Sequence, residues 1–392
     1  MRIVDMRVTP VAVPDPPLRN SWGIHESAFL RVIIQLYSDD GLVGLGEAPG
    51  GGATARALEA IRTLVIGHDP WQLEPLRVTL RNARLFCALE EACLDLIGKA
   101  TGRPISDLLG GTVRQRVPYA AYLFYKEAGD DEWGEVLSPE AMVGLAERWV
   151  ERWGFRCLKV KGGVLEPDAE VETVRLLRQH FGPGMGLRID PNAVWSVETS
   201  RRVAHKLRDA DLEYLEDPCA GIAGMAAVAR STHIPLSTNM CVTAFEHIPE
   251  AFRADAVSVV LADHHVWEGL TGCVKLAKVC HALGWGVGQH SNSHLGITMA
   301  AMTHLAAAVP NLIYASDSHY PWLEEDLIKG PMFHFADGYL EVPKGPGLGV
   351  ELDEDKLERF AAAYRERQAH TRDDVTAMRE RDSSWLPLMP RW

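Results

Sequence analysis

The sequence predicts an α/β protein: a (β/α)₈-type barrel (a modified TIM barrel) with an α+β capping domain formed by the N-terminal region and the C-terminal segment. Three observations predict this fold: a length of 392 residues, an early block of strands followed by helix, and a later regular alternation of strands and helices. Because such a barrel occupies about 250 residues, a second, smaller domain is expected. We place the capping domain at 1–115, the barrel at 116–325 and a segment returning to the capping domain at 326–392.

The two ends of the chain predict the capping domain. Residues 1–50 have the composition of a strand meander, with DDG as a typical hairpin turn. From 54 to 101 the apolar residues recur at helical spacing, and Gly102 marks the helix end. From about 329 onward, MFHFADGYLEV predicts strand, turn and strand, followed by a charged helix that packs back on the N-terminal domain.

Short apolar strands alternate with helical stretches from Val117 onward, which indicates successive βα units and a parallel sheet. We count eight strands: VPYAAYLF, CLKVKGG, GLRIDPN, YLEDP, PLSTN, AVSVVLAD, WGVGQH and LIYASDS. From the second strand on, polar strand ends recur every 23 to 29 residues, close to the roughly 30 residues that one βα unit needs. Because all carboxyl ends of barrel strands surround one mouth, seven side chains are expected to converge: Lys161, Asp190, Glu216, Asn239, Asp263, His290 and Asp317.

Charge and composition argue against several classes of partner. The formal net charge of -13 disfavours nucleic acid and anionic membrane surfaces, because both require a basic binding face. No apolar run approaches about 18 residues, and Asp5 and Arg7 interrupt the apolar stretch that a signal peptide would need. The seven cysteines form no C-x-x-C pair, as expected for reduced thiols. We therefore predict a cytoplasmic protein and, from the base rate, a closed homo-oligomer.

Asp190, Glu216 and Asn239 end three consecutive strands and offer three oxygen donors. Such donors suit a hard divalent cation, so we predict a Mg²⁺ site with open positions for substrate. No Cys or His joins them in the sequence, which makes zinc a poorer fit. The alternative is that DPN and EDP are only turns, in which Asp or Asn caps a helix and Pro begins it. The one-unit spacing of the three residues favours the metal site.

Lys159 and Lys161 lie two residues apart on the strand before the metal strands, so their side chains share one face. If that face is the barrel interior, neither is an ordinary surface lysine. Two neighbouring ammonium groups disfavour each other's charge, which would lower the pKa of the more buried lysine and let it act as a base. An exposed edge strand is the alternative, but a closed barrel has no edge.

Asp263 and His290 end the sixth and seventh strands and are therefore expected to be adjacent. A carboxylate beside an imidazole orients the ring and raises its basicity, the usual arrangement of a general base. A lone buried histidine is more often structural, but the Asp partner and the position at a strand end favour catalysis. The lysine and the histidine would then face opposite sides of a bound carbon atom.

These motifs resemble the enolase superfamily, whose members use Lys or His bases with one or two Mg²⁺ ions to stabilise an enediolate. Within it, KVK, DPN, EDPC and STNM resemble glucarate dehydratases, with Asn rather than an acid at the third metal position. AYLFY, LADHHVW, HSNSH, ASDSH and GPGLGVELD are similar to other segments of the same family. The resemblance covers nearly the whole chain.

The resemblance implies an acid-sugar dehydratase that abstracts the proton alpha to a carboxylate and eliminates the beta hydroxyl, converting D-glucarate to 5-keto-4-deoxy-D-glucarate. It implies His290 as the base with Asp263 as its partner, and Lys161 as the base for the opposite configuration at carbon. Lys159 would contact the substrate carboxylate. Asn192 and Asn292 would stabilise the enolate or position hydroxyls, and the further implied substrate contacts are His25, Tyr122, Phe124, Asp317, His319 and Arg372.

Other functions fit the same residues. The acid sugar could be galactarate or idarate, and a racemase or epimerase of the same superfamily needs only bases on both faces of one carbon. A catalytically weak paralogue that serves as a binding partner would bind Mg²⁺ without turnover of any diacid. The third metal ligand is informative because Asn239 leaves two anionic ligands, which makes the site less negative toward a doubly charged diacid.

Overall fold

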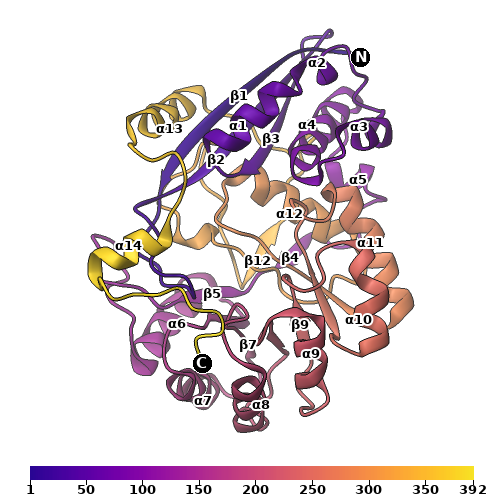
Figure 1. The fold of residues 1–392 in the computed structure, drawn as a ribbon. Helices are drawn as coiled ribbons and strands as arrows, with labels where there is room; N and C mark the ends of the chain where they lie inside the picture. Colours follow the sequence, from indigo (N-terminus) through magenta and orange to yellow (C-terminus); the bar gives the residue numbers. More distant parts are fainter.

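The computed structural model describes residues 1–392. A three-stranded antiparallel sheet in the order β1-β2-β3 forms one side of the capping domain, with β1 at Ile3–Pro14, β2 at Ala28–Ser38 and β3 at Val43–Pro49 (Figure 1). The connection from β2 to β3 is the predicted DDG turn, where Gly41 has a φ of 83°, a left-handed value that glycine adopts without strain. The predicted meander is confirmed.

Helices cover one face of this sheet. The longest, α4, begins after Asn82, whose side chain accepts a hydrogen bond from the Leu85 N–H, and ends at Gly102 with a φ of 68°. It packs closely on β3 because Gly44 and Gly46 present no Cβ to the backbone of α4. The predicted helical stretch is confirmed as four separate helices, followed by a short fifth: α1 Gly52–Ala60, α2 Arg62–Val65, α3 Leu73–Leu80, α4 Ala83–Thr101 and α5 Ile105–Leu108.

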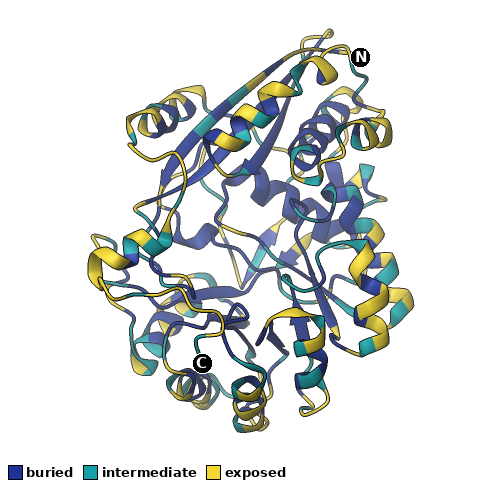
Figure 2. Cartoon of the chain, viewed as in Figure 1, coloured by how far each residue is buried: buried dark blue, intermediate teal, exposed yellow.

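A parallel sheet of seven strands, paired in chain order, curls into the barrel. Its strands are buried, and the helices around it expose their outer faces (Figure 2). The strands are β5 Ala121–Phe124, β6 Cys157–Lys161, β7 Gly186–Asp190, β8 Tyr214–Glu216, β9 Leu236–Thr238, β10 Val259–Ala262 and β11 Gly286–Gln289. The helices are α6 Pro139–Trp153, α7 Pro167–Phe181, α8 Val197–Lys206, α9 Gly221–Ala229, α10 Ile248–Ala254 with the short η1 Phe245–His247 before it, α11 Gly269–Leu283 and α12 Gly296–Ala308.

The eighth predicted strand, LIYASDS, does not form a continuous strand. Instead, Leu312 makes an isolated parallel bridge to Val287 of β11, and Ser316 makes one to Tyr119 just before β5. The Ser316 N–H donates to the Pro118 carbonyl at 2.9 Å, and its carbonyl accepts from Ala120 at 2.9 Å. The segment therefore occupies the eighth position and joins the first strand to the last, although its pairing is too sparse for a strand.

The C-terminal segment differs from its prediction in one respect. The turn forms at Asp337, but MFHFA is not a strand, and β12 (Tyr339–Glu341) pairs instead with β4 (Arg116–Pro118) at the barrel entry. The short helix η2 (Tyr320–Trp322) comes before β12 in the chain. The charged helix α13 (Glu354–Glu366) then lies against β1, and α14 (Asp374–Arg381) lies between the capping domain and the barrel (Figure 1).

Helix α12 is apolar on all sides because the fold buries it completely. Every residue of Gly296–Ala308 is buried, packed against β3, α5, β4 and α11 of the same chain. A contact with a second subunit is therefore not needed to explain its composition. No helix combines the length and apolarity that crossing a membrane requires. All seven cysteines are free.

A buried ion pair connects the capping domain to the barrel. Arg31 of β2 donates to Glu47 of β3 at 2.6 Å, and both side chains are almost fully buried. Glu47 also accepts hydrogen bonds from the backbone N–H groups of Leu295 and Thr298, each at 2.9 Å, at the start of α12. Although burial alone would raise it, the pKa of Glu47 is lowered by the positive charge of Arg31 and by these donors. The carboxylate therefore anchors α12, the helix that follows the loop after β11.

We expect the Glu47→Gln substitution to lower the free energy of unfolding by about 3 to 5 kcal/mol, because it leaves the buried Arg31 charge uncompensated. Urea denaturation followed by circular dichroism measures this change. Glu351→Gln, which removes the partner of Lys329 in an exposed pair, is the control and should leave the stability essentially unchanged. Equal changes in both variants would contradict the anchoring role.

Candidate active site

A cavity of about 370 Å³ lies at the carboxyl ends of the barrel strands. The barrel supplies most of its wall, and the roof comes from the loop around Trp22 in the capping domain and from Arg372 in the C-terminal segment. Most of the predicted site residues line it: His25, Tyr122, Phe124, Lys161, Asn192, Asn239, Asp263, His290, Asn292, His319 and Arg372. The others lie in a buried layer that is not part of its wall: Lys159, Asp190, Glu216 and Asp317.

The three predicted metal ligands lie on neighbouring strands. Asp190 ends β7, Glu216 ends β8 and Asn239 follows β9, and these strands are adjacent in the sheet. The Asn239 amide donates to Glu216 Oε1 at 3.2 Å. Burial and repulsion from Asp190 raise the pKa of Glu216 well above its usual range. A divalent cation between the two carboxylates would relieve both effects, so the donor set fits a hard metal ion.

Two further residues hold these ligands, and one of them, Asp217, was not predicted. Asp217 accepts hydrogen bonds from the Asn239 N–H at 2.8 Å and from the Thr238 hydroxyl at 2.6 Å, which fixes the turn after β9. The sequence signal for this role was the EDP motif, in which Asp217 directly follows the predicted ligand Glu216 and had no role assigned to it. Asn192, a predicted substrate contact, donates its backbone N–H to Asp190 at 2.9 Å and lies with a φ of 51° at the cavity wall.

The predicted depression of a lysine pKa is wrong for the arrangement seen here. Burial opposes the charged form of Lys161, but Asp190, whose carboxylate lies 2.6 Å from the Lys161 ammonium, raises its pKa above the usual range. Lys159 has the same opposition from burial, and Asp317 and Glu216 raise its pKa further. The sequence argument considered lysine repulsion alone, whereas the carboxylates are closer and more numerous.

Lys159 and Asp317 lie below the cavity and do not reach it. The Lys159 ammonium is 2.6 Å from carboxylate oxygens of both Glu216 and Asp317, and all three side chains are fully buried. Asp317 also accepts from Arg188 at 3.2 Å. In this arrangement, these residues form an ion cluster that supports the metal ligands, and neither contacts the space available to a substrate.

Asp263 and His290 form the expected pair. His290 Nδ1 is 3.3 Å from Asp263 Oδ2, and His290 Nε2 has no protein partner. Although burial would raise it, the pKa of Asp263 is held well below its usual range by hydrogen bonds from His265 and His290 and by their charge. An ionised Asp263 keeps the His290 proton on Nδ1, which leaves Nε2 free to accept a proton from a substrate.

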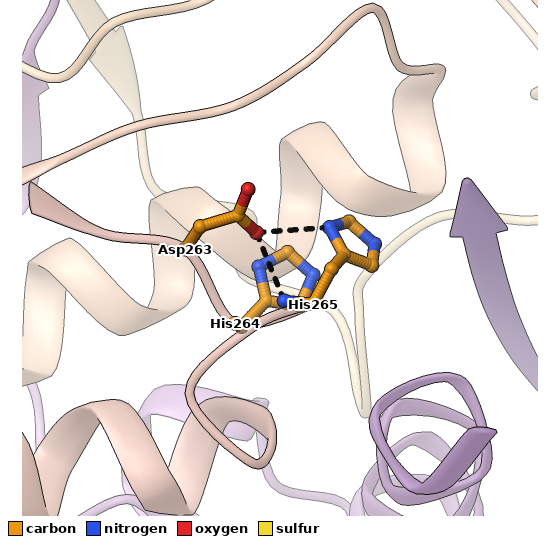
Figure 3. A group of neighbouring side chains, drawn as sticks. All are labelled: Asp263, His264 and His265. Carbon is orange, nitrogen blue, oxygen red and sulfur yellow. Dashed lines mark hydrogen bonds and ion pairs between the residues drawn. The ribbon is translucent and has the colours of Figure 1, made fainter. Parts of the chain in front are cut away.

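Asp263 stands at the beginning of a compact cluster with His264 and His265 (Figure 3). Their potential ligand atoms lie within 4.8 Å of one another. However, the two imidazole rings are tilted by 37° with centroids 4.0 Å apart, and His265 Nδ1 is already engaged by Asp263 Oδ1 at 3.1 Å. Both Asp263 oxygens already accept hydrogen bonds. The cluster is therefore organised as a hydrogen-bonded support of the dyad rather than as a cation site.

The roof of the cavity is polar and densely paired. His25 Nδ1 is 2.9 Å from Asp15, and the Arg372 guanidinium forms two hydrogen bonds to Asp374, at 2.6 and 2.8 Å. Asn20 donates to the same Asp374 carboxylate at 2.7 Å. Asn20, Trp22 and Asp374 line the cavity but were not predicted, although they flank His25 and Arg372 in the sequence. Residues near the chain end also hold this roof, because Arg391 donates to the Ser21 carbonyl at 2.6 Å.

Comparisons with known proteins agree with this architecture. Residues 141–356 match the family model described as enolase C-terminal domain-like, and residues 3–110 match the mandelate racemase / muconate lactonizing enzyme N-terminal domain. A probable glucarate dehydratase from Streptomyces coelicolor is 42% identical over 430 aligned positions, which cover 100% of this chain and 99% of that protein. A muconate cycloisomerase from Acinetobacter lwoffii is 27% identical, over 84% of this chain and 88% of its own.

Two solved structures superpose on the whole chain. An enolase from Mycobacterium smegmatis complexed with tartrate is 45% identical with a TM-score of 0.97, covering 100% of this chain and 98% of its own. An enolase from Thermobispora bispora complexed with magnesium and formate is 44% identical with a TM-score of 0.97, covering 100% of both chains. Together with the two matched domains, these similarities place the chain in the enolase superfamily, of which it is a member.

Proposed function

We propose that this chain is a Mg²⁺-dependent dehydratase of an acid sugar, with D-glucarate as its substrate and 5-keto-4-deoxy-D-glucarate as its product. One observation carries the proposal: Lys161 and His290 line the same cavity from β6 and β11, across the mouth from each other, beside the carboxylates at the ends of β7 and β8. The 42% identity to a probable glucarate dehydratase supports the choice of substrate.

The chemistry required is removal of a weakly acidic proton from the carbon next to a carboxylate. A cation held by Asp190, Glu216 and Asn239 would act as a Lewis acid and stabilise the negative charge that develops on that carboxylate. Its positive charge would also counter the Asp190 charge that raises the pKa of Lys161. Lys161 would then be able to release its proton and serve as a base.

The proton transfers follow from the positions of the two bases. His290 Nε2 accepts the alpha proton from one face of the substrate carbon, while the ionised Asp263 stabilises the resulting imidazolium. The same imidazolium can return its proton to the beta hydroxyl as that group leaves as water. Lys161 performs the abstraction for the epimer that presents its proton on the other face. Asn292, which lines the cavity two residues after His290, is suited to hydrogen-bond the developing enolate.

The roof suits the far end of a diacid. Arg372 and His25 lie at the cavity wall, and beside them Tyr122, Phe124 and His319 pack against one another with ring centroids 4.7 to 5.0 Å apart. A second carboxylate reaching Arg372 would compete with Asp374 for the guanidinium. Galactarate and idarate offer the same two carboxylates and remain alternative substrates of the same mechanism. We also propose, from the base rate for soluble enzymes, that the chain assembles as a homo-oligomer.

A racemase or epimerase is the second candidate, because two bases across one carbon suffice for inversion without elimination. A solved isomerase from Streptomyces coelicolor is 37% identical with a TM-score of 0.83. The two candidates differ in product, since epimerisation retains the beta hydroxyl.

The proposal is tested by proton NMR of the purified protein with Mg²⁺ and, in separate tubes, D-glucarate, L-idarate and galactarate. We expect D-glucarate to give the keto-deoxy diacid, with a loss of about 100- to 10,000-fold in rate for His290→Asn. Epimerisation without elimination would replace the dehydratase by the racemase candidate. Bound Mg²⁺ with no change in any diacid would favour the weak paralogue.

Metal binding is testable without turnover. We expect saturating Mg²⁺ to raise the thermal unfolding midpoint of the wild type. At a Mg²⁺ concentration of 100 times the dissociation constant, the added free energy of unfolding is about 2.7 kcal/mol. Glu216→Gln should lose this increment. Glu213→Gln is the matched control, because Glu213 lies just before the same strand but pairs with Arg188 at its other end. An unchanged Mg²⁺ increment in Glu216→Gln would contradict the assigned ligands.

Charge balance explains an amide as the third ligand. The buried cations Lys159, Lys161 and Arg188 are matched by three buried carboxylates, Asp190, Glu216 and Asp317. A bound Mg²⁺ would therefore add two positive charges to this otherwise matched cluster, which favours binding of a doubly charged diacid.

We expect Asn239→Asp to add a negative charge beside the substrate and lower kcat/KM for the diacid by roughly tenfold or more. Steady-state kinetics at saturating Mg²⁺ measure this loss, and Asn239→Gln serves as the neutral comparison. Full activity of the Asp variant would contradict the charge argument.

A further inference from the structure

Asp263, the carboxylate that pairs with His290, has a second partner on its other oxygen. Asp263 uses Oδ2 for His290 and Oδ1 for His265, whose backbone N–H lies 2.9 Å away and whose ring Nδ1 lies 3.1 Å away (Figure 3). His265 does not line the cavity, and only 5% of its surface is exposed. It therefore touches the catalytic carboxylate without access to a substrate.

The hydrogen-bond partners of His265 determine where its ring proton lies. An ionised carboxylate only accepts hydrogen bonds, so the contact with Asp263 requires a proton on His265 Nδ1. On the other side of the ring, Nε2 lies 3.1 Å from the Glu47 carbonyl oxygen, which only accepts, and 3.3 Å from Arg31 Nη2, which only donates. The contact with Asp263 therefore fixes a proton on Nδ1, whereas the two partners of Nε2 place opposite demands on that nitrogen.

Arg31 itself is fixed by the capping domain. Its Nε donates to Glu47 at 2.6 Å, and its Nη2 also lies 3.3 Å from the Thr298 hydroxyl. The same Glu47 carboxylate binds the start of α12, directly after the loop that carries His290. The Arg31–Glu47 pair of the cap is thus connected indirectly to both residues of the dyad. It reaches Asp263 through His265, and it reaches the loop that carries His290 through the start of α12.

We propose that His265 is a positioning residue: its ring is held on the far side by Glu47 and Arg31 of the capping domain, donates its Nδ1–H to Asp263 and holds that carboxylate in the rotamer that orients His290. This inference rests on the proposed role of His290 as a base. It assigns His265 no contact with substrate. Replacement of His265 should impair proton transfer by His290 and spare proton transfer by Lys161, which is held by Asp190 on the other side of the mouth.

The tautomer can be read without any substrate. Long-range ¹H–¹⁵N spectra of ¹⁵N-labelled protein distinguish protonated from bare ring nitrogens, and the His265→Asn spectrum identifies the His265 signals among the 15 histidines. We expect a protonated Nδ1 for His265. A bare Nδ1 would overturn the inference whatever the state of Nε2, and whether or not the protein turns over an acid sugar.

The role in catalysis is tested by deuterium exchange in D₂O with D-glucarate and L-idarate, which are epimers at one alpha carbon and so present their proton to opposite bases. His265→Leu removes the donor to Asp263 and is expected to slow exchange from D-glucarate by about 10- to 100-fold, the cost typical of a displaced catalytic group. Exchange from L-idarate, which depends on Lys161, should stay near the wild-type rate and shows that the variant is folded.

His265→Asn is the matched variant, because its side-chain amide can reach Asp263 in place of Nδ1 while losing the contact with Arg31. We expect it to recover most of the D-glucarate exchange lost in His265→Leu. Equal loss with both epimers, or no loss with either, would overturn the positioning role. If the wild type exchanges neither diacid, the proposed function fails, and the ring tautomer alone decides the inference.

Discussion

The ion pair between Arg31 and Glu47 is the interaction on which the site geometry depends. It is buried between the cap sheet and α12, so its cost of desolvation is offset only if both charges keep all their partners. Those partners fix the distance between the cap and the barrel mouth. They also include His265, and through it Asp263. The main polar contact between the capping domain and the barrel is thus connected to the Asp263–His290 pair.

Below the mouth, a second set of charges holds the barrel ends together. Lys159 bridges Glu216 and Asp317, and Arg188 joins Asp317 to Glu213. Lys159, Arg188 and Glu216 lie on the neighbouring parallel strands β6, β7 and β8, and Asp317 ends the segment at the eighth position of the barrel. The barrel geometry therefore brings these side chains together. The price is a dense group of buried charges, and it explains why the pKa of each lysine is raised rather than lowered. The bound cation and the substrate would complete the charge balance.

Much of this arrangement could be predicted from the sequence. The spacing of polar strand ends predicted the barrel, and it brought Asp190, Glu216, Asn239, Asp263 and His290 together as the structure has them. Depth was harder to predict. Strand-end spacing and period-two alternation cannot distinguish the mouth from the layer beneath it, so the sequence offered nothing against the substrate contacts that the resemblance implied for Lys159 and Asp317. The sparse pairing of the eighth segment depends on both of its neighbours, and the contact of His265 with Arg31 joins residues 234 positions apart.

A crystal structure with Mg²⁺ and tartrate would test the central claim, that one carbon atom lies between two bases beside a metal ion. The account predicts Mg²⁺ at about 2.0 to 2.1 Å from oxygens of Asp190, Glu216 and Asn239. A tartrate carboxylate should complete the coordination, with its alpha carbon between the Lys161 ammonium and His290 Nε2. A metal ion bound elsewhere, or an alpha carbon out of reach of both bases, would contradict the account.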